Sequence, residues 1–239
     1  MGKPFLLVLE GLDGSGKSTQ CDLLTQRLRQ EDIFFQRISF PDYQDPSSSL
    51  VRMYLSGEFG GSPQEVNPYA AASFYAVDRY ASYQRFWRRP YHDGAVIIAD
   101  RYTTSNLIYQ MPKLPKDQWD AFSAWVEDYE YGKLGLPRPD GVLYLDVPPE
   151  VSQELLTQRY EGDEGKKDLH ERSRTYLLDC RHAALFCVQK QGWKAIPCAK
   201  EGAIREKEAI HQEIWEYLRQ FLPTLRRGKE RTQKGEATK

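Results

Sequence analysis

The chain has 239 residues, enough for one large domain or two small ones, and its 40% hydrophobic and 28% charged residues are ordinary for a globular protein. A formal net charge of −1 gives no electrostatic reason to expect nucleic acid or an anionic membrane as a partner. No apolar run approaches the roughly 20 residues that a membrane span needs, so we expect no membrane association.

The location of the protein is predicted from two features. The N-terminus enters a strand almost at once, which leaves no room for a signal peptide. The four cysteines lack the spacing of a zinc site or a disulfide framework, so we expect reduced thiols in a cytoplasmic protein.

The first predicted elements enclose a phosphate-binding loop. An apolar strand at residues 5–9 precedes the pattern G-x-x-x-x-G-K-S at residues 11–18, and a helix follows at 19–29. Glycines let backbone N–H groups turn toward phosphate oxygens, Lys17 adds a charge for the β- and γ-phosphates, and the Ser18 hydroxyl can ligate Mg²⁺. Asp13 is ambiguous here, because it could accept from a sugar hydroxyl or face solvent in a turn.

Five apolar runs alternate with helical stretches and predict a parallel sheet of an α/β protein with helices on both faces. The expected strands are residues 5–9, 33–40, 95–99, 142–147 and 193–197. The expected later helices are residues 67–89, ending before Pro90, then 116–131, 148–159, 170–191 and 203–222. Without a repeat or linker, we expect one domain over residues 1–223, followed by a basic, disordered tail at 224–239.

Three further clusters follow in chain order. Phe40, Pro41 and Tyr43 come just after the second strand, where ligands bind in doubly wound sheets, although Phe40 could also be a core residue. Phe74 and Arg79 suit a planar base with a carbonyl edge, but their spacing alone favours a core aromatic and a surface ion pair. Asp100 and Arg101 come directly after the strand at 95–99, and beside a phosphate loop this favours a carboxylate near Mg²⁺ and a cation near phosphate over a structural ion pair.

Taken together, these motifs and the segment at 136–140 (Leu-Pro-Arg-Pro-Asp) resemble the thymidylate kinases in order and spacing, from Lys3 to about Leu222. The resemblance implies a three-layer P-loop kinase fold of five parallel strands with a mobile lid. It implies Mg²⁺-assisted transfer of the ATP γ-phosphoryl to dTMP, giving dTDP. Family members are commonly homodimers, and the aromatic helix could contribute to such an interface.

The resemblance also assigns residues. The ATP phosphate loop would consist of Gly11, Asp13, Gly14, Ser15, Gly16, Lys17, Ser18 and Thr19, with Asp13 reaching the acceptor sugar. Phe74 would stack on the pyrimidine and Arg79 would bind its carbonyl edge. Asp100 and Ser18 would lie near the metal, and Arg101 near the phosphates. Tyr109 and Gln110 would line the sugar and base, and Phe40 and Pro41 also belong to the acceptor site.

Two departures from the family pattern shape these expectations. Gly14 stands where some members have a catalytic arginine, so we expect the cation from a lid at residues 158–174, with Arg159, Arg172 and Arg174 as candidates. The alternative for that segment is a polar surface loop. Tyr43 stands where the family has an arginine for the acceptor phosphate, and Arg52 is the suggested substitute.

The sequence is compatible with three functions. The first is phosphorylation of dTMP, and the second is the same chemistry on another deoxynucleoside monophosphate or a deoxynucleoside. The third is a regulator that binds nucleotide without transferring phosphate. Loss of Lys17, Asp100 or Arg101 would favour the regulator, and all three residues are present.

Overall fold

The protein is an α/β fold built on one parallel sheet. The computed structural model describes residues 3–159, 161, 163, 169–171 and 173–222. Its sheet has five strands in the order β2-β3-β1-β4-β5, and every neighbouring pair is parallel. The strands are β1 (Phe5–Glu10), β2 (Phe35–Ser39), β3 (Val96–Asp100), β4 (Gly141–Asp146) and β5 (Lys194–Pro197). The predicted five-stranded sheet and its parallel arrangement are confirmed.

Nine α-helices, together with shorter helical turns, connect these strands in the described part of the chain. Their bounds are α1 (Lys17–Gln30), α2 (Ser49–Leu55), α3 (Pro68–Ser82), α4 (Arg88–His92), α5 (Thr104–Tyr109), α6 (Trp119–Val126), α7 (Pro149–Arg159), α8 (Arg174–Gln191) and α9 (Lys207–Arg219). Among these residues, no helix combines the length and apolarity needed to cross a membrane.

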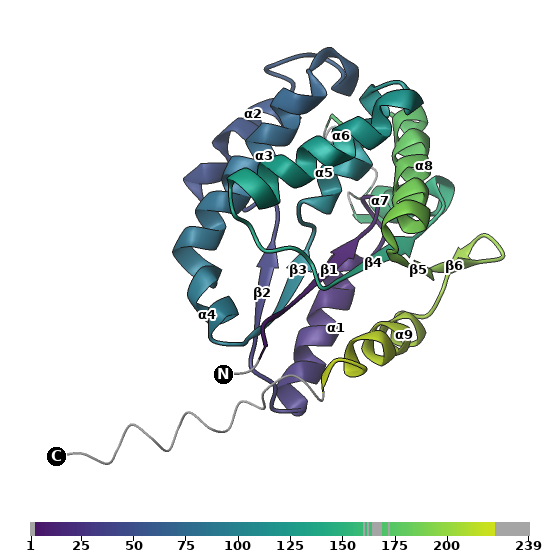
Figure 1. Cartoon of the computed structure of the whole chain (residues 1–239). Coiled ribbons are helices and arrows are strands. Elements are labelled where there is room, and N and C mark those ends of the chain that lie inside the picture. Colours follow the sequence, from purple (N-terminus) through teal and green to yellow (C-terminus); the bar gives the residue numbers. More distant parts are fainter. Residues whose placement is uncertain (1–2, 160, 162, 164–168, 172, 223–239) are drawn as a thin grey trace.

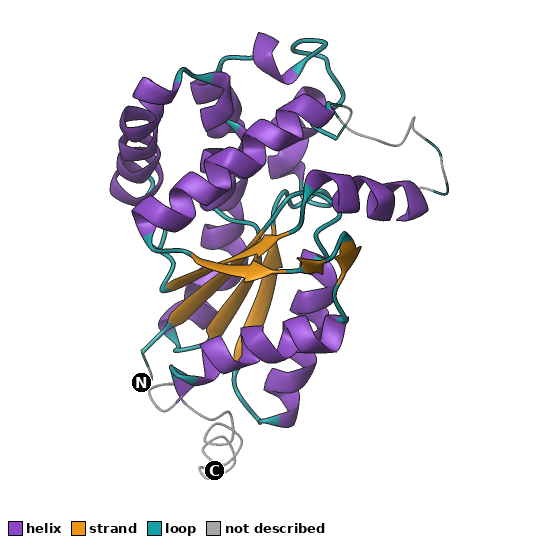
Figure 2. Cartoon of the chain, turned by 90° about the vertical axis from the view of Figure 1, so that its right-hand side faces the viewer, coloured by secondary structure: helices purple, strands orange, loops and turns teal. Residues whose placement is uncertain are grey.

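Alternate residues of the central strands face two different hydrophobic layers. Leu6 and Val8 belong to the cluster that packs against α3, α5, α6 and α8. Leu7 and Leu9 belong to a second cluster with α1 and α9. Figure 1 shows α1 and α9 together on one side of the sheet, and Figure 2 shows the strands between two layers of helices. The continuous apolar runs of the sequence follow from this double coverage.

The aromatic helix continues past the proline that was expected to end it. Asn67 caps α3 as predicted, accepting from the Tyr69 N–H at 2.9 Å. A π-helical turn, Tyr83–Trp87, then joins α3 to α4, which contains Pro90. Trp87, which precedes α4, has φ −124° and ψ −1°, so Pro90 is the third residue of a new helix. A backbone N–H in the first turn has no partner within its helix, so α4 tolerates the missing donor of the proline.

Two later helices begin further along the chain than predicted. Helix α8 starts at Arg174, where the Ser173 hydroxyl accepts from the Tyr176 N–H at 3.3 Å, so His170 precedes the helix. Helix α9 starts at Lys207, because residues 199–204 form a small antiparallel hairpin, β6 (Ala199–Lys200) with β7 (Ala203–Ile204). The predicted basic tail at 224–239 lies outside the described residues.

Candidate active site

The turn between β1 and α1 has the backbone shape that a phosphate loop needs. Gly14 and Gly16 have φ values of +78° and +80°, in the left-handed region that favours glycine. Lys17 begins α1, so the first N–H groups of the helix open toward the loop. The Lys17 ammonium donates to the Gly11 and Leu12 carbonyls at 2.9 Å each, and burial lowers the pKa of Lys17 to about 8. The loop therefore holds a buried amine beside a helix N-terminus.

Gly14 occupies a position with no space for a side chain. A Cβ there would lie 2.6 Å from the Ser152 carbonyl oxygen and 3.0 Å from Leu156 Cγ, both on α7. An arginine at this position would have to push α7 away from the loop, at the cost of close packing. The arrangement of α7 thus explains why the loop itself supplies no arginine.

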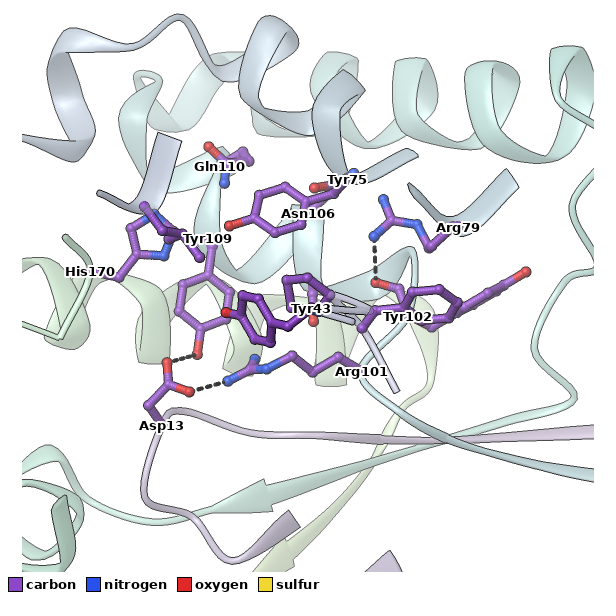
Figure 3. A pocket seen from close by; sticks show the side chains of 14 residues that line it. Asp13, Tyr43, Tyr75, Arg79, Arg101, Tyr102, Asn106, Tyr109, Gln110 and His170 are labelled. Atoms are coloured by element: carbon purple, nitrogen blue, oxygen red, sulfur yellow. Dashed lines mark hydrogen bonds and ion pairs between the residues drawn. The ribbon is translucent and has the colours of Figure 1, made fainter. Parts of the chain in front are cut away.

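Asp13 lies between two side chains from later parts of the chain. Its carboxylate accepts from Arg101 Nη2 at 2.5 Å and from the Tyr109 hydroxyl at 3.1 Å (Figure 3). Burial alone would raise the pKa of Asp13, but the charges of Arg101 and Lys17 outweigh it and lower that pKa to about 2. The carboxylate is therefore ionised and points into the site, and the alternative of a solvent-facing turn residue is wrong.

Arg101 has a strained backbone that directs its side chain toward the loop. Its φ is +68°, a region that costs a residue other than glycine roughly 1–2 kcal/mol. Its guanidinium lies 5.0 Å from the Tyr109 ring centroid and donates to the Gly11 carbonyl at 3.3 Å. Such strain is concentrated at functional sites, and here it places a cation beside the phosphate loop.

Two pockets meet at this point. The first, which we call the inner pocket, contains about 470 Å³ of space when its open mouth is included. Its lining consists of Asp13, Phe40, Pro41, Tyr43, Leu55, Tyr75, Arg79, Arg101, Tyr102, Ser105, Asn106, Tyr109, Gln110 and His170. The second, the loop pocket, surrounds residues 13–19 and reaches Asp100.

The inner pocket and the loop pocket share one wall. It is formed by Asp13, Phe40, Pro41, Tyr43 and Arg101. Figure 3 shows Asp13 and Arg101 on one side of the inner pocket, with Tyr75 and Gln110 on the opposite side. A ligand in the inner pocket can therefore meet a ligand on the loop at the charged end, next to Arg101.

Arg79 is fixed at the inner pocket by a buried ion pair. Its Nε and Nη2 donate to the Glu130 carboxylate at 2.6 and 2.7 Å, and both side chains are 1% exposed. The remaining Nη1 lies 3.4 Å from the Tyr102 carbonyl oxygen. Asn106 also donates to Glu130, at 2.8 Å. The surface ion pair considered for Arg79 is wrong, because Glu130 holds the guanidinium in the pocket wall.

Gln110 brings a buried amide to the same pocket. Neither Gln110 Oε1 nor Nε2 has a hydrogen-bond partner among the described residues, and the side chain is fully buried. An unpaired buried amide costs free energy, so such a group in a pocket wall indicates a polar ligand. A carboxamide offers both a donor and an acceptor, as an edge of a nucleobase does.

Tyr75, and not Phe74, faces the inner pocket. Phe74 is absent from the lining and packs against Phe59, with ring centroids 5.3 Å apart. Tyr75 stands one turn before Arg79 on α3, so the two side chains share a helix face. The i,i+4 spacing to Arg79 was the available signal, since Phe74 lies five residues away. The prediction that Phe74 lines the base site is therefore corrected to Tyr75.

Tyr43 lines both pockets as expected, but Arg52 does not. Arg52 Nη1 donates to the Tyr43 carbonyl at 2.9 Å and to the Ser48 hydroxyl at 2.6 Å, and Nη2 donates to the Ser49 hydroxyl at 3.0 Å. The guanidinium thus holds the loop that carries Tyr43 and is not part of either pocket lining. Its predicted role as the phosphate-binding substitute is wrong, because these loop contacts occupy it.

The predicted metal ligands lie close to each other. Ser18 in the first turn of α1 and Asp100 at the end of β3 both line the loop pocket, and both carry the oxygen donors that Mg²⁺ prefers. Arg37 on β2 lies between them, with Nη2 3.0 Å from Ser18 Oγ and 3.8 Å from Asp100 Oδ2. Ser18 Oγ and Asp100 Oδ2 could both ligate a metal that arrives with a nucleotide. The Arg37 guanidinium contacts both oxygens in this structure.

The predicted lid is only partly within the described residues. The side chain of Arg159 and the whole of Arg172 lie outside them. Arg174 Nη2 donates to Glu150 Oε1 at 2.8 Å, on the outer side of α7. At the end of the segment, His170 lines the inner pocket and Glu171 lines the loop pocket, and both are buried. No pattern in the sequence marks either residue as part of a pocket, because the pattern there predicts a helix over 170–191.

His170 is a buried, neutral histidine. Its Nε2 lies 2.8 Å from the Tyr54 hydroxyl, and its ring stacks on Tyr109 with centroids 5.3 Å apart. Lys113 Nζ donates to the same Tyr54 hydroxyl at 2.8 Å. Burial, with the nearby charge of Lys113, lowers the pKa of His170 to about 3. A protonated imidazole is therefore disfavoured at this position.

Acid should destabilise the protein through His170. The unfolded chain takes up this proton near pH 6.5 and the folded chain only near pH 3, so stability falls as the pH drops through that window. From pH 7 to pH 5, we expect a loss of about 2 kcal/mol from this group. Urea unfolding at both pH values should show a smaller loss for His170→Gln, while the exposed His182→Gln keeps the wild-type loss. Equal losses in all three proteins would contradict this expectation.

Comparisons with known proteins agree on one family. A family model described as thymidylate kinase matches residues 9–214. A thymidylate kinase of Mycobacterium tuberculosis (strain H37Rv) is 32% identical over 193 residues, covering 79% of this chain and 87% of the relative. One from Danio rerio is 25% identical and covers 87% of each chain. A solved thymidylate kinase from Candida albicans has a TM-score of 0.66 at 21% identity, covering 94% of this chain and 95% of that one, which supports the fold.

Proposed function

The chain belongs to the thymidylate kinase family, and we propose that its two connected pockets transfer the ATP γ-phosphoryl to dTMP. The loop pocket would take the triphosphate of ATP and the inner pocket the monophosphate. The observation that carries this assignment is the shared wall, where Asp13, Tyr43 and Arg101 line both pockets. A kinase needs its donor and acceptor phosphates to meet at one place, and this wall provides a single charged meeting point.

The residues around the wall supply positioning and charge, which is most of what phosphoryl transfer requires. The loop N–H groups and Lys17 would bind the donor phosphates. Arg101 would neutralise charge that develops on the migrating group, while Asp13 and Tyr109 hold its guanidinium in place. The Mg²⁺ that accompanies ATP would be held by Ser18 and Asp100 and would neutralise phosphate oxygens when bound.

The far end of the inner pocket suits a pyrimidine. Arg79 and Asn106 are both anchored on Glu130, which fixes their positions in the wall. Gln110 adds an amide without a partner in the described chain. These groups would pair with the polar edge of the base, and Tyr75 offers a ring to stack on its face.

Tyr75→Ala should raise the KM for dTMP by about tenfold or more and leave the KM for ATP nearly unchanged, because base stacking is worth roughly 1–3 kcal/mol. Steady-state kinetics with each nucleotide varied in turn would measure this. Phe74→Ala is the matched control, since its ring packs on Phe59 away from the pocket. A larger acceptor effect for Phe74→Ala than for Tyr75→Ala would contradict the assignment.

A coupled ADP-release assay tests the function itself. We expect turnover with dTMP and compare it with dUMP, dCMP, dGMP and thymidine as acceptors. Faster turnover with one of these would favour the alternative of another deoxynucleotide or deoxynucleoside, to which Tyr43 in place of an arginine first pointed. ATP binding without any acceptor turnover would favour a nucleotide-binding regulator.

We also propose that the protein is a homodimer through α3. Val77 and Tyr80 on this helix are 46% and 40% exposed, and exposed apolar side chains at helical spacing are typical of a helix interface. Light scattering after gel filtration should report a dimer for the wild type and a monomer for the double variant Val77→Glu, Tyr80→Glu. Phe34→Glu, a single change of the same kind at an exposed aromatic outside α3, should remain dimeric.

The remaining expectations also stay proposals. We place residues 1–223 in one kinase domain, with a lid at 158–174 whose end brings His170 and Glu171 to the two pockets. The four cysteines are free and buried, which is consistent with the reducing cytoplasm.

A further inference from the structure

Arg37 forms a set of contacts at the donor site that the reaction as described does not use. The residue lies on β2, the edge strand, two residues before the carboxyl end that pairs Ser39 with Asp100. Its Nη1 forms an ion pair with Asp22 Oδ1, and its Nη2 donates to Ser18 Oγ at 3.0 Å. The same Nη2 is 3.8 Å from Asp100 Oδ2. One guanidinium therefore spans the first turn of α1 and the end of β3.

These contacts place a fixed positive charge between the two oxygens expected to hold the metal. Mg²⁺ requires oxygen ligands at short distances in a near-octahedral shell, and a guanidinium in contact with the same oxygens competes for that space. An arginine fork also binds phosphate oxygens directly, because its N–H groups match their geometry. Arg37 itself is outside the lining of the loop pocket, but its Nη2 contacts Ser18 and Asp100, which both line that pocket, and the side chain is 29% exposed.

We propose that Arg37 is a resident cation of the donor site, which binds nucleotide phosphate when no metal is present and gives way to Mg²⁺ when the metal arrives. When Mg²⁺ arrives, the Arg37 guanidinium would turn toward Asp22, which already forms an ion pair with Nη1. The Asp22 side chain is 65% exposed on the outer face of α1. The proposal rests on the donor site of the proposed function. With Lys17 and Arg101 on the acceptor side of the loop, Arg37 adds a third cation on the side of Ser18 and Asp100.

Equilibrium binding of ATP, with Mg²⁺ and with EDTA, tests this proposal by calorimetry without any turnover. The measured quantity is the ratio of the ATP affinity in Mg²⁺ to the affinity in EDTA. Arg37→Met should weaken binding in EDTA and spare binding in Mg²⁺, raising the ratio about tenfold, the size of one charged hydrogen bond. Arg37→Lys, which keeps the charge without the fork, should fall between Arg37→Met and wild type.

Two further variants separate the inference from general charge effects. Arg29→Met removes the same charge from the far end of α1, about 18 Å along the helix, and should keep the wild-type ratio. Asp22→Asn releases Arg37 toward the phosphates and should lower the ratio below wild type. Equal ratios in wild type, Arg37→Met and Asp22→Asn would overturn the proposal while leaving the donor site intact. Failure of the wild type to bind ATP in either buffer would instead overturn the proposed function and, with it, this role.

Discussion

Lys17→Ala is expected to lower kcat by about 10³-fold. Phosphoryl transfer depends on positioning and on neutralising charge, and removal of one preorganised donor commonly costs 10²–10³-fold. Lys17 also donates to two loop carbonyls, so its loss removes a charge and loosens the loop that cradles the phosphates. Measuring kcat with saturating ATP and dTMP would show the effect.

The control for this change is Lys200→Ala, an exposed lysine whose ion pair within the described residues is with its neighbour Glu201 at 3.9 Å. Its kcat should equal that of the wild type. Thermal unfolding of both variants separates lost chemistry from lost folding. A Lys17→Ala enzyme that is folded and retains near-normal kcat would show that Lys17 is not the phosphate-binding cation.

Glu130→Gln is expected to destabilise the fold by about 3 kcal/mol, because it leaves the buried charge of Arg79 without its partner. Both side chains are almost completely buried, and Asn106 also loses a charged acceptor. Urea unfolding would measure the loss, and the KM for dTMP should rise because Arg79 is no longer held in the wall of the inner pocket.

A matched control exists on the surface nearby. Glu127→Gln breaks the exposed ion pair with Arg138, and we expect it to cost less than about 1 kcal/mol. The double variant Glu130→Gln, Arg79→Met should recover part of the stability lost in Glu130→Gln, since no unpaired charge remains. A single Glu130→Gln variant as stable as the wild type would mean that Arg79 finds another partner.

The sheet could be predicted from the sequence because its strands are covered on both faces. Leu6, Leu7, Val8 and Leu9 point alternately to two layers of helices, so apolar residues occur without a break. The phosphate loop could be predicted equally well, since its strand, glycine-rich turn and helix are adjacent in the chain. Such local patterns can be interpreted without knowing which distant residues are in contact.

Helix boundaries, and which side chains of a helix face the pocket, were predicted less well. A π-helical turn separates α3 from α4, so that Pro90 lies in the first turn of α4, and no single-residue preference signals that π-helical turn. Phe74 and Tyr75 are neighbours, yet about 100° of helix rotation separates them and only one faces the pocket. His170 was assigned to a helix, although the cap at Ser173 starts that helix after it.

The sequence by itself determined the chemistry of the phosphate loop, because the residues of that loop are adjacent in the chain. It also determined the family, because the motifs of the family occur in a fixed order and spacing along the chain. The tertiary structure decided which residues from distant segments meet there. Arg101 and Tyr109 reach Asp13 across about 90 residues of chain, and Arg37 on β2 reaches Ser18 on α1. The tertiary structure also explained why the loop has glycine at position 14, since the carbonyl of Ser152 fills the space that a side chain would need. Contacts between distant segments depend on how helices pack over the sheet, and no local pattern in the chain encodes that packing.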